Sequence, residues 1–210
     1  MTTFEHAMLG VDGALAAGLD RRWGWPIVAL AGFVAVLPDW DGLAILFGVG
    51  VFDRVHRTVG HNLLVCLSLG ALVAALEYRF SLALRLKEWA GRRFRALASQ
   101  EPSPKRRVFR LGELSVWLAV GIVASLSHLA ADVVFSGHPQ LSDWGLRLLW
   151  PFSDRLWAYP MVSWGDPGPT LVFVAGMFAM LRWPRHRQLL AGLTLTLVLG
   201  YVSMRGVIGG

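Results

Sequence analysis

The 210-residue chain is 55% hydrophobic and 16% charged, whereas ordinary soluble domains carry roughly 25% charged residues. Its long apolar runs do not alternate with polar residues, which excludes a protein built from β-strands, and its single cysteine excludes an intramolecular disulfide. Helices satisfy their own backbone hydrogen bonds in lipid. We therefore predict an all-α, polytopic helical membrane protein that forms one domain over residues 1–210.

Six apolar segments follow one another along the chain. A membrane-spanning helix needs about 20 residues, with a range of about 17–25, so the third, fourth and sixth segments are long enough and the others are short. We expect about five to six transmembrane segments. A further apolar stretch, 42–52, is too short to span and is expected to form a re-entrant or interfacial piece. The six segments are 4–19, 23–37, 59–78, 111–135, 170–183 and 188–207.

Most of the 20 lysines and arginines lie in three places: after the first segment, in the loop 79–110, and after the fifth segment. Positive loops face the cytoplasm. This distribution predicts a multi-pass inner-membrane protein with both termini outside, and it explains the net charge of +6 without nucleic acid. The basic loop is expected to hold an interfacial helix over 82–97, which touches anionic lipid headgroups, and then a break at 100–104. Trp144 is expected to mark the outer membrane interface.

The unusual ionisable residues all fall at the outer ends of the predicted segments. A charge at membrane depth is costly, so such a cluster predicts a functional site. His128 and Asp132 are four residues apart and would share one face of a helix. His56 and His61 suit a loop that enters a helix, and Pro38 starts a turn that carries two carboxylates. The full set is His6, Asp39, Asp41, His56, His61, His128 and Asp132.

Four imidazoles and three carboxylates favour a divalent metal ion, with zinc first and manganese or iron as alternatives. Seven ligands exceed the roughly four of one zinc site, so either two ions or one ion with supporting residues is expected. A bound metal ion activates water, which predicts hydrolysis of an ester or phosphoester. Arg57 could hold an anionic oxygen, so Arg57, His61 and Asp41 are the predicted catalytic residues.

Other readings of these residues remain open. A His–Asp acid–base site needs no metal. A metal-ion or small-solute transporter would also place His and Asp in helices, but near the membrane midplane with access from both sides. A scaffold without catalytic activity would keep its His–Asp pairs as structural hydrogen bonds.

Three blocks of the sequence resemble a known family. LPDWD at 37–41, HRTVGHNLL at 56–64 and SHLAAD at 127–132 are similar to the signatures of the YdjM-like (LexA-regulated) family, called membrane-bound metal-dependent hydrolases. These signatures read roughly LPDxDH, HRGxTHSLL and SHLxxDxxTxxGxxxLWP. The segment 145–151 resembles the tail of the third block, and His6 is similar to an early histidine of the family. The resemblance covers most of residues 1–155.

The chain departs from the family pattern at a few positions. Gly42 replaces the histidine that ends the first block, Val59 and Gly60 replace Phe and Thr, and Asn62 replaces Ser. The resemblance implies a metal-dependent hydrolase of the bacterial inner membrane. A small-molecule, lipid or lipid-linked substrate is expected, because the predicted site opens at headgroup depth on the extracytoplasmic side.

Overall fold

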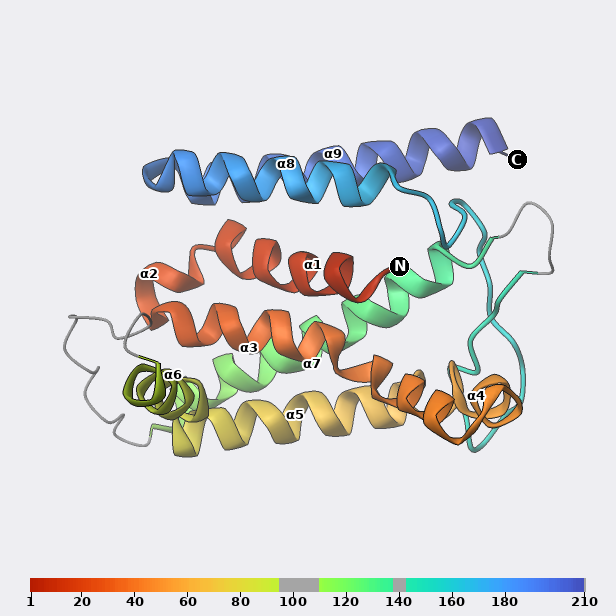
Figure 1. The fold of residues 1–210 in the computed structure, drawn as a ribbon, viewed down its shortest axis with the longest axis horizontal. Helices are drawn as coiled ribbons and strands as arrows, with labels where there is room; N and C mark the ends of the chain where they lie inside the picture. The colour runs from red at the N-terminus through yellow and green to blue at the C-terminus, as the bar shows by residue number, and fades with distance from the viewer. Residues whose placement is uncertain (95–109, 138–142, 210) are drawn as a thin grey trace.

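The computed structural model describes residues 1–94, 110–137 and 143–209, and within them every regular element is a helix. The expected all-α fold is confirmed. The helices lie side by side as a bundle, with α8 and α9 against α1 on one flank and α5 on the other (Figure 1). The elements are α1 Thr3–Ala16, α2 Leu19–Trp23, α3 Trp25–Val36, η1 Leu37–Phe47, α4 Val49–Val55, α5 Leu63–Phe80, α6 Leu82–Arg93, α7 Leu111–Val134, α8 Gly168–Arg182, η3 Pro184–His186 and α9 Arg187–Gly209.

Four stretches of the described chain are long and apolar enough to cross a membrane. The helix α8 is apolar but shorter, with 15 residues, and α1 has 14. The expected count of five to six transmembrane segments therefore stays a prediction. The four stretches are Trp25–Phe47, Leu63–Phe80, Leu111–Val134 and Pro184–Ile208.

Glycines allow the helices that carry the polar residues to pack closely. A Cβ atom on Gly121 of α7 would lie 2.4 Å from the carbonyl oxygen of Gly70 on α5. A Cβ atom on Gly10 of α1 would lie 2.3 Å from the carbonyl oxygen of Ala31 on α3. Neither contact leaves room for a side chain, and small residues serve the same purpose wherever membrane helices approach closely.

Local capping fixes where α1 and α5 begin. Thr2 and Glu5 form a capping box at the start of α1, in which each side chain accepts a hydrogen bond from the other residue's backbone amide. The side chain of Asn62 accepts from the amide of Val65, 2.9 Å away, so α5 begins at Leu63 rather than at the predicted 59. The residues before Asn62 are thereby released to form a loop.

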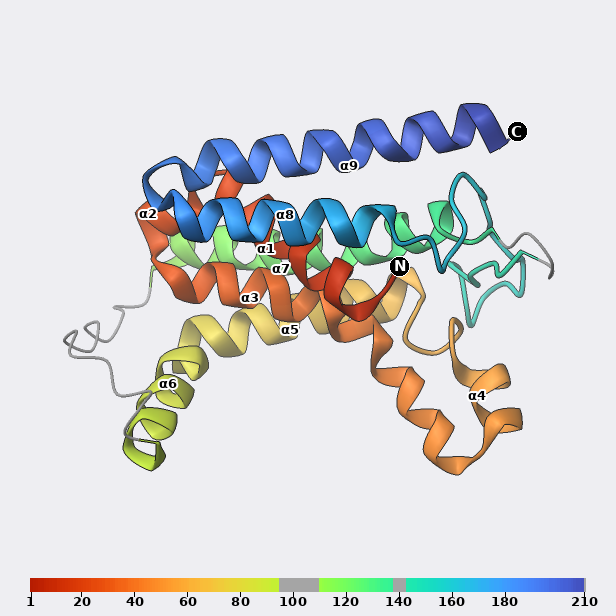
Figure 2. The same ribbon diagram turned by 45° about the horizontal axis from the view of Figure 1, so that its top comes forward.

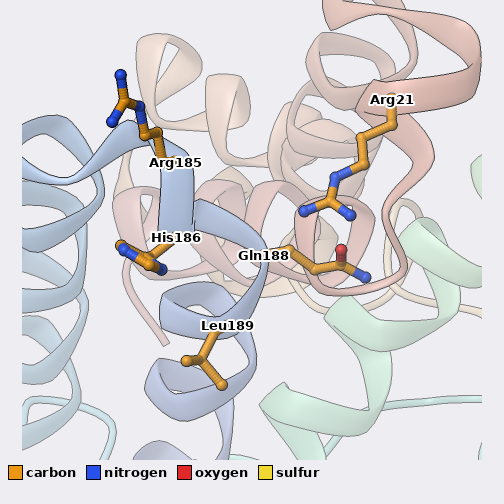
Figure 3. A pocket seen from close by; sticks show the side chains of 5 residues that line it. All are labelled: Arg21, Arg185, His186, Gln188 and Leu189. Atoms are coloured by element: carbon orange, nitrogen blue, oxygen red, sulfur yellow. The ribbon is translucent and has the colours of Figure 1, made fainter.

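The basic elements gather at the end of the bundle where α2, α6 and the α8–α9 turn lie (Figure 1). Arg187 at the start of α9 pairs with Asp20 of α2. A pocket of about 370 Å³ lies between α2 and the α8–α9 turn, with Arg21 on one side and Arg185 and His186 on the other (Figure 3). Two of the three basic clusters thus meet, as expected if they face the same side of a membrane.

Two arms leave the bundle sideways, one near each end (Figure 2). The first is η1 with α4, which contains the apolar stretch 42–52. The second is α6, which matches the predicted interfacial helix as far as Arg93. The remainder of that prediction, 95–97 and the break at 100–104, lies outside the described residues.

We expect Gly121→Leu to destabilise the protein, because the added side chain has to displace the backbone of α5. Overpacking of this kind costs roughly 1–3 kcal/mol. Gly112, on the same helix, is the matched control, because nothing lies within 4 Å of a Cβ atom built on it. Thermal unfolding of the purified protein in detergent should show a clearly lower midpoint for Gly121→Leu than for Gly112→Leu. Equal midpoints would contradict the close packing of α5 on α7.

Candidate metal centre

The seven polar residues singled out by the sequence meet at the end of the bundle opposite the basic elements. His6 lies in the first turns of α1, Asp39 and Asp41 in η1, and His128 and Asp132 in the last turns of α7. His56 and His61 lie in the loop between α4 and α5. Each of the seven belongs to a group whose ligand atoms lie within 4.8 Å of one another.

Four of these side chains point their donor atoms at one common position. Nε2 of His61 lies 3.1 Å from Nε2 of His128. Oδ1 of Asp39 lies 3.4 Å from the first nitrogen and 3.6 Å from the second. Oδ2 of Asp132 lies 3.5 Å and 3.6 Å from the same two nitrogens. Tetrahedral zinc, with bonds of about 2.0–2.2 Å, separates its ligand atoms by about 3.3–3.6 Å. The two imidazoles with Asp132, or with Asp39, are therefore spaced as ligands of one ion would be.

Hydrogen bonds on the far side of each ring fix which nitrogen faces the centre. Nδ1 of His128 lies 2.7 Å from the carbonyl oxygen of Ala35, which can only accept, so Nδ1 carries the proton. Nδ1 of His61 donates to Oδ2 of Asp41 at 3.0 Å. The Nε2 atoms of the two rings consequently face each other, and either a proton on His61 or an ion can lie between them. Metal-binding histidines are held in this way by a carbonyl or carboxylate behind them.

Asp41 organises the loop behind His61. Its Oδ2 atom also accepts from the amide of Gly60 at 2.9 Å, and its Oδ1 atom accepts from Nδ1 of His56 at 2.8 Å. A Cβ atom on Gly60 would lie 2.2 Å from the carbonyl oxygen of Pro38, so only glycine fits there. The buried thiol of Cys66, the single cysteine, donates to the carbonyl of Gly60.

His6 and the first residue support the centre from the α1 side. The ring of His6 stacks on that of His128, with 3.6 Å between centroids, and its Nε2 atom donates to Oδ1 of Asp132 at 3.0 Å. The amine of Met1 lies 2.8 Å from the same oxygen. Asp132 therefore points one oxygen at these donors and the other at the centre.

Arg57 is held beside the centre. One guanidinium nitrogen lies 3.6 Å from Oδ2 of Asp132, another donates to the carbonyl of Trp144, and the group stacks 4.3 Å above the Trp144 ring. The N–H on Nε is buried and has no hydrogen-bond partner among the described residues. Arg57 also has a φ of +61°, a left-handed backbone conformation that residues other than glycine rarely adopt. The chain thus holds this arginine in place at some conformational cost.

The electrostatics of the centre favour a cation. Burial on its own lowers the pKa of His61, but hydrogen bonds to Asp132, Asp39 and Asp41 outweigh burial and raise the pKa to about 10. A buried imidazole holds a proton this firmly only where the carboxylates around it attract positive charge strongly. The same attraction would favour a divalent ion.

Asp39, His61, His128 and Asp132 carry the donor atoms around the two facing imidazole nitrogens, and the supporting residues His6, Asp41 and His56 lie beside or behind them. All seven belong to groups that could hold an ion, and the expectation of one or two ions stays a prediction. Trp144, expected to mark the membrane interface, also holds Arg57, and no sequence signal predicted that contact. Asp166 lies elsewhere: it accepts from the hydroxyl of Tyr201 and pairs with Arg205.

Comparison with known families identifies the family of the chain. A model of the YdjM inner membrane protein matches residues 1–209. The chain belongs to the YdjM family. Its membership, together with its apolar helices, makes it a membrane protein, as predicted. No curated protein and no solved structure matches the chain.

Gly42 stands where the YdjM family signature has a histidine, and the structure shows which residues that histidine would contact. The position where the family signature has a histidine lies beside His56, because a Cβ atom built on Gly42 would be 3.8 Å from its Nδ1 atom. An imidazole at 42 would therefore join Asp41 and His56 rather than the four donors Asp39, His61, His128 and Asp132. These four donors are present although Gly42 replaces the histidine.

We expect variants of the four donor residues and variants of the supporting residues to differ in how much zinc they bind. Replacing Asp39, His61, His128 or Asp132 by alanine should abolish stoichiometric zinc, because each supplies a donor atom. His6→Ala and Asp41→Asn should retain zinc with an affinity about 10–100-fold lower, as is typical when supporting residues are changed. Elemental analysis and zinc titration of the purified proteins measure both effects. Full zinc retention in His128→Ala would contradict the assignment.

We expect Gly42→His to create a further ligand beside His56 and Asp41. The variant should bind more zinc per chain than the native protein in the same titration. The double variant Gly42→His/His56→Ala should return to the native stoichiometry, because the added imidazole then lacks its partner. An unchanged stoichiometry in Gly42→His would show that position 42 does not reach this group.

Proposed function

We propose that the protein is a metal-dependent hydrolase that cleaves an ester or phosphoester of a lipid or lipid-linked substrate at the extracytoplasmic face. The observation that carries this proposal is the buried, unpartnered Nε–H of Arg57 beside four convergent metal-type donors. An unpartnered buried donor costs free energy, which an acceptor from a substrate would recover. A bound divalent ion supplies an activated water and polarises the substrate oxygen.

The residues of this chain have distinct proposed roles. His61, His128, Asp39 and Asp132 would hold the ion. Asp39 is the most exposed of the four, with 23% of its side chain accessible, so substrate would approach from its side. Asp41 keeps His61 in the tautomer that the ion needs. Asp41 could also accept a proton through His56, which is itself partly exposed and hydrogen-bonded to it.

Arg57 is the proposed group for the negative charge that develops on the substrate. Asp132 and Trp144 hold its guanidinium before substrate arrives, so no reorganisation is needed during the reaction. Fixed donors of this kind account for a large part of the rate enhancement in acyl and phosphoryl transfer. Arginine also suits phosphate oxygens because its donors form a rigid planar fork.

The arm formed by η1 and α4 supports a lipid substrate. Besides Trp40, it carries five large exposed apolar residues next to the centre, and the most exposed are Leu46 at 77% and Phe47 at 79%. Exposed apolar surface of this extent indicates contact with a membrane or a partner. The others are Leu43, Ile45 and Val49. An arm inserted among acyl chains would bring lipid headgroups close to Asp39.

The alternative is a metal-ion carrier that does not catalyse hydrolysis. Four protein ligands around one ion form a closed site, which favours holding an ion, whereas catalytic zinc usually keeps a position open. A carrier should, however, expose its site to both sides near the midplane. The centre lies at one end of the bundle, and Arg57 would have no purpose in a carrier, so we favour the hydrolase.

We expect zinc-loaded protein to turn over at least one substrate in a panel of soluble and lipid esters and phosphoesters. Arg57→Gln should reduce kcat about 10²–10³-fold with unchanged zinc content, because it removes a donor to the developing charge. Arg54→Gln, an exposed change three residues earlier, is the control and should be neutral. In spheroplasts, an impermeant chelator should abolish the activity if the centre faces outward. Bound metal without turnover of any substrate would favour the carrier, and absence of any stoichiometric divalent metal, whether zinc, manganese or iron, would refute the hydrolase.

A further inference from the structure

An apolar groove of about 540 Å³ lies at the end of the bundle opposite the metal centre, where α3, α5 and the α6 arm meet. Its walls come from two of the stretches long enough to cross a membrane and from the amphipathic helix that follows. The lining residues are apolar except for Glu77 and Lys87. They are Trp25, Ala29, Leu30 and Phe33 of α3, Val73 and Glu77 of α5, and Leu82, Ala83, Leu86, Lys87 and Ala90 of α6.

The groove is held open by specific contacts. The carboxylate of Glu77 accepts a hydrogen bond from the amide of Ala83, 2.8 Å away, which fixes the first turn of α6 to the end of α5. Ser81 between them adopts the left-handed conformation that turns the chain sideways. Leu84 is buried against the bundle and anchors the arm. The angle of α6, seen in Figure 2, is therefore part of the fold.

The chain itself does not cover the apolar walls in the part that the structure describes. Phe33 of α3 is 60% exposed, Leu86 of α6 is 63% exposed, and Trp25 and Leu82 are also exposed. Because the walls belong to membrane-spanning stretches, the groove opens towards lipid rather than water. An elongated apolar molecule already present in the bilayer, such as an acyl chain, matches this shape and chemistry.

The charge at the rim of the groove specifies the headgroup. The ammonium group of Lys87 lies 5.7 Å from the ring of Trp25, and no carboxylate forms an ion pair with it among the described residues. The rest of α6 carries Arg85, Arg92 and Arg93 against a single acid, Glu88. Basic residues on an interfacial helix attract anionic lipids, at about 1 kcal/mol per charge. A lipid phosphate at the rim would form the ion pair that the ammonium group of Lys87 lacks among the described residues.

We propose that this groove binds one anionic phospholipid from the leaflet opposite the metal centre, with an acyl chain between α3 and α6 and its phosphate at Lys87. The lipid would fill the space that the fixed angle of α6 leaves beside α3. This site is separate from the metal centre and does not depend on what the centre does.

Native mass spectrometry of the full-length protein in detergent tests the proposal, with phosphatidylglycerol and phosphatidylcholine of identical acyl chains as probes. The native protein should retain phosphatidylglycerol several-fold more than phosphatidylcholine. Lys87→Gln should reduce phosphatidylglycerol to the level of phosphatidylcholine. Arg85→Gln removes the same charge from the same helix outside the groove, and it should retain the native preference. Glycerol phosphate should not displace the lipid, because it lacks the acyl chain.

Filling the groove provides the second arm of the experiment. Ala83→Trp and Ala90→Trp each place a large side chain where the acyl chain would lie, so both should lose phosphatidylglycerol and phosphatidylcholine alike. Unfolding midpoints and zinc content close to native would show that these variants fold. Retention of lipid in both folded variants would overturn the proposal. So would equal loss in Lys87→Gln and Arg85→Gln, or a native dimer that Ala83→Trp dissociates, since a second copy would then occupy the groove.

Discussion

The contact on which the functional end of the molecule depends is the 3.1 Å approach of two imidazole nitrogens, Nε2 of His61 and Nε2 of His128. The opposite nitrogen of each ring is committed to a hydrogen bond with Asp41 or Ala35, so the two Nε2 atoms face each other. Two imidazole nitrogens at this distance need a positive charge between them, which either the proton on His61 or a metal ion supplies. The carboxylates of Asp39 and Asp132 attract such a charge from beside the pair.

The rest of the fold can be understood as the means of holding these donors. The glycine contacts bring α1 against α3 and α5 against α7, so that the ends of all four helices converge. The Asn62 cap delays the start of α5 and leaves a loop in which His56, Arg57 and His61 can turn inward. Gly60 lets this loop pass close to Pro38. Because these contacts use backbone and small residues, they leave the polar side chains free for the centre.

The sequence predicted the helical fold and the residues that gather at its polar end. Hydropathy and the placement of arginine and lysine fix where each helix ends, and the end positions alone bring His6, Asp39, His61, His128 and Asp132 to one place. The sequence did not distinguish the four donors of the centre from their supports, because that depends on side-chain rotation and on partners distant in the chain. The carbonyl of Ala35 belongs to the backbone, so no residue type in the sequence indicates its contact with His128. Trp144 looks in the sequence like any tryptophan at a membrane interface, so its contact with Arg57 could not be predicted.

The unequal lengths of the helices have a consequence for how water reaches the centre. With a rise of 1.5 Å per residue, α1 is about 21 Å long and α7 about 36 Å, and His128 lies about 9 Å before the end of α7. The amine of Met1 lies 2.8 Å from Asp132, so α1 begins level with the last turns of α7 and its missing length falls at the opposite end of the bundle. The centre therefore lies near the end of the bundle, where Asp39 keeps 23% of its side chain accessible to water.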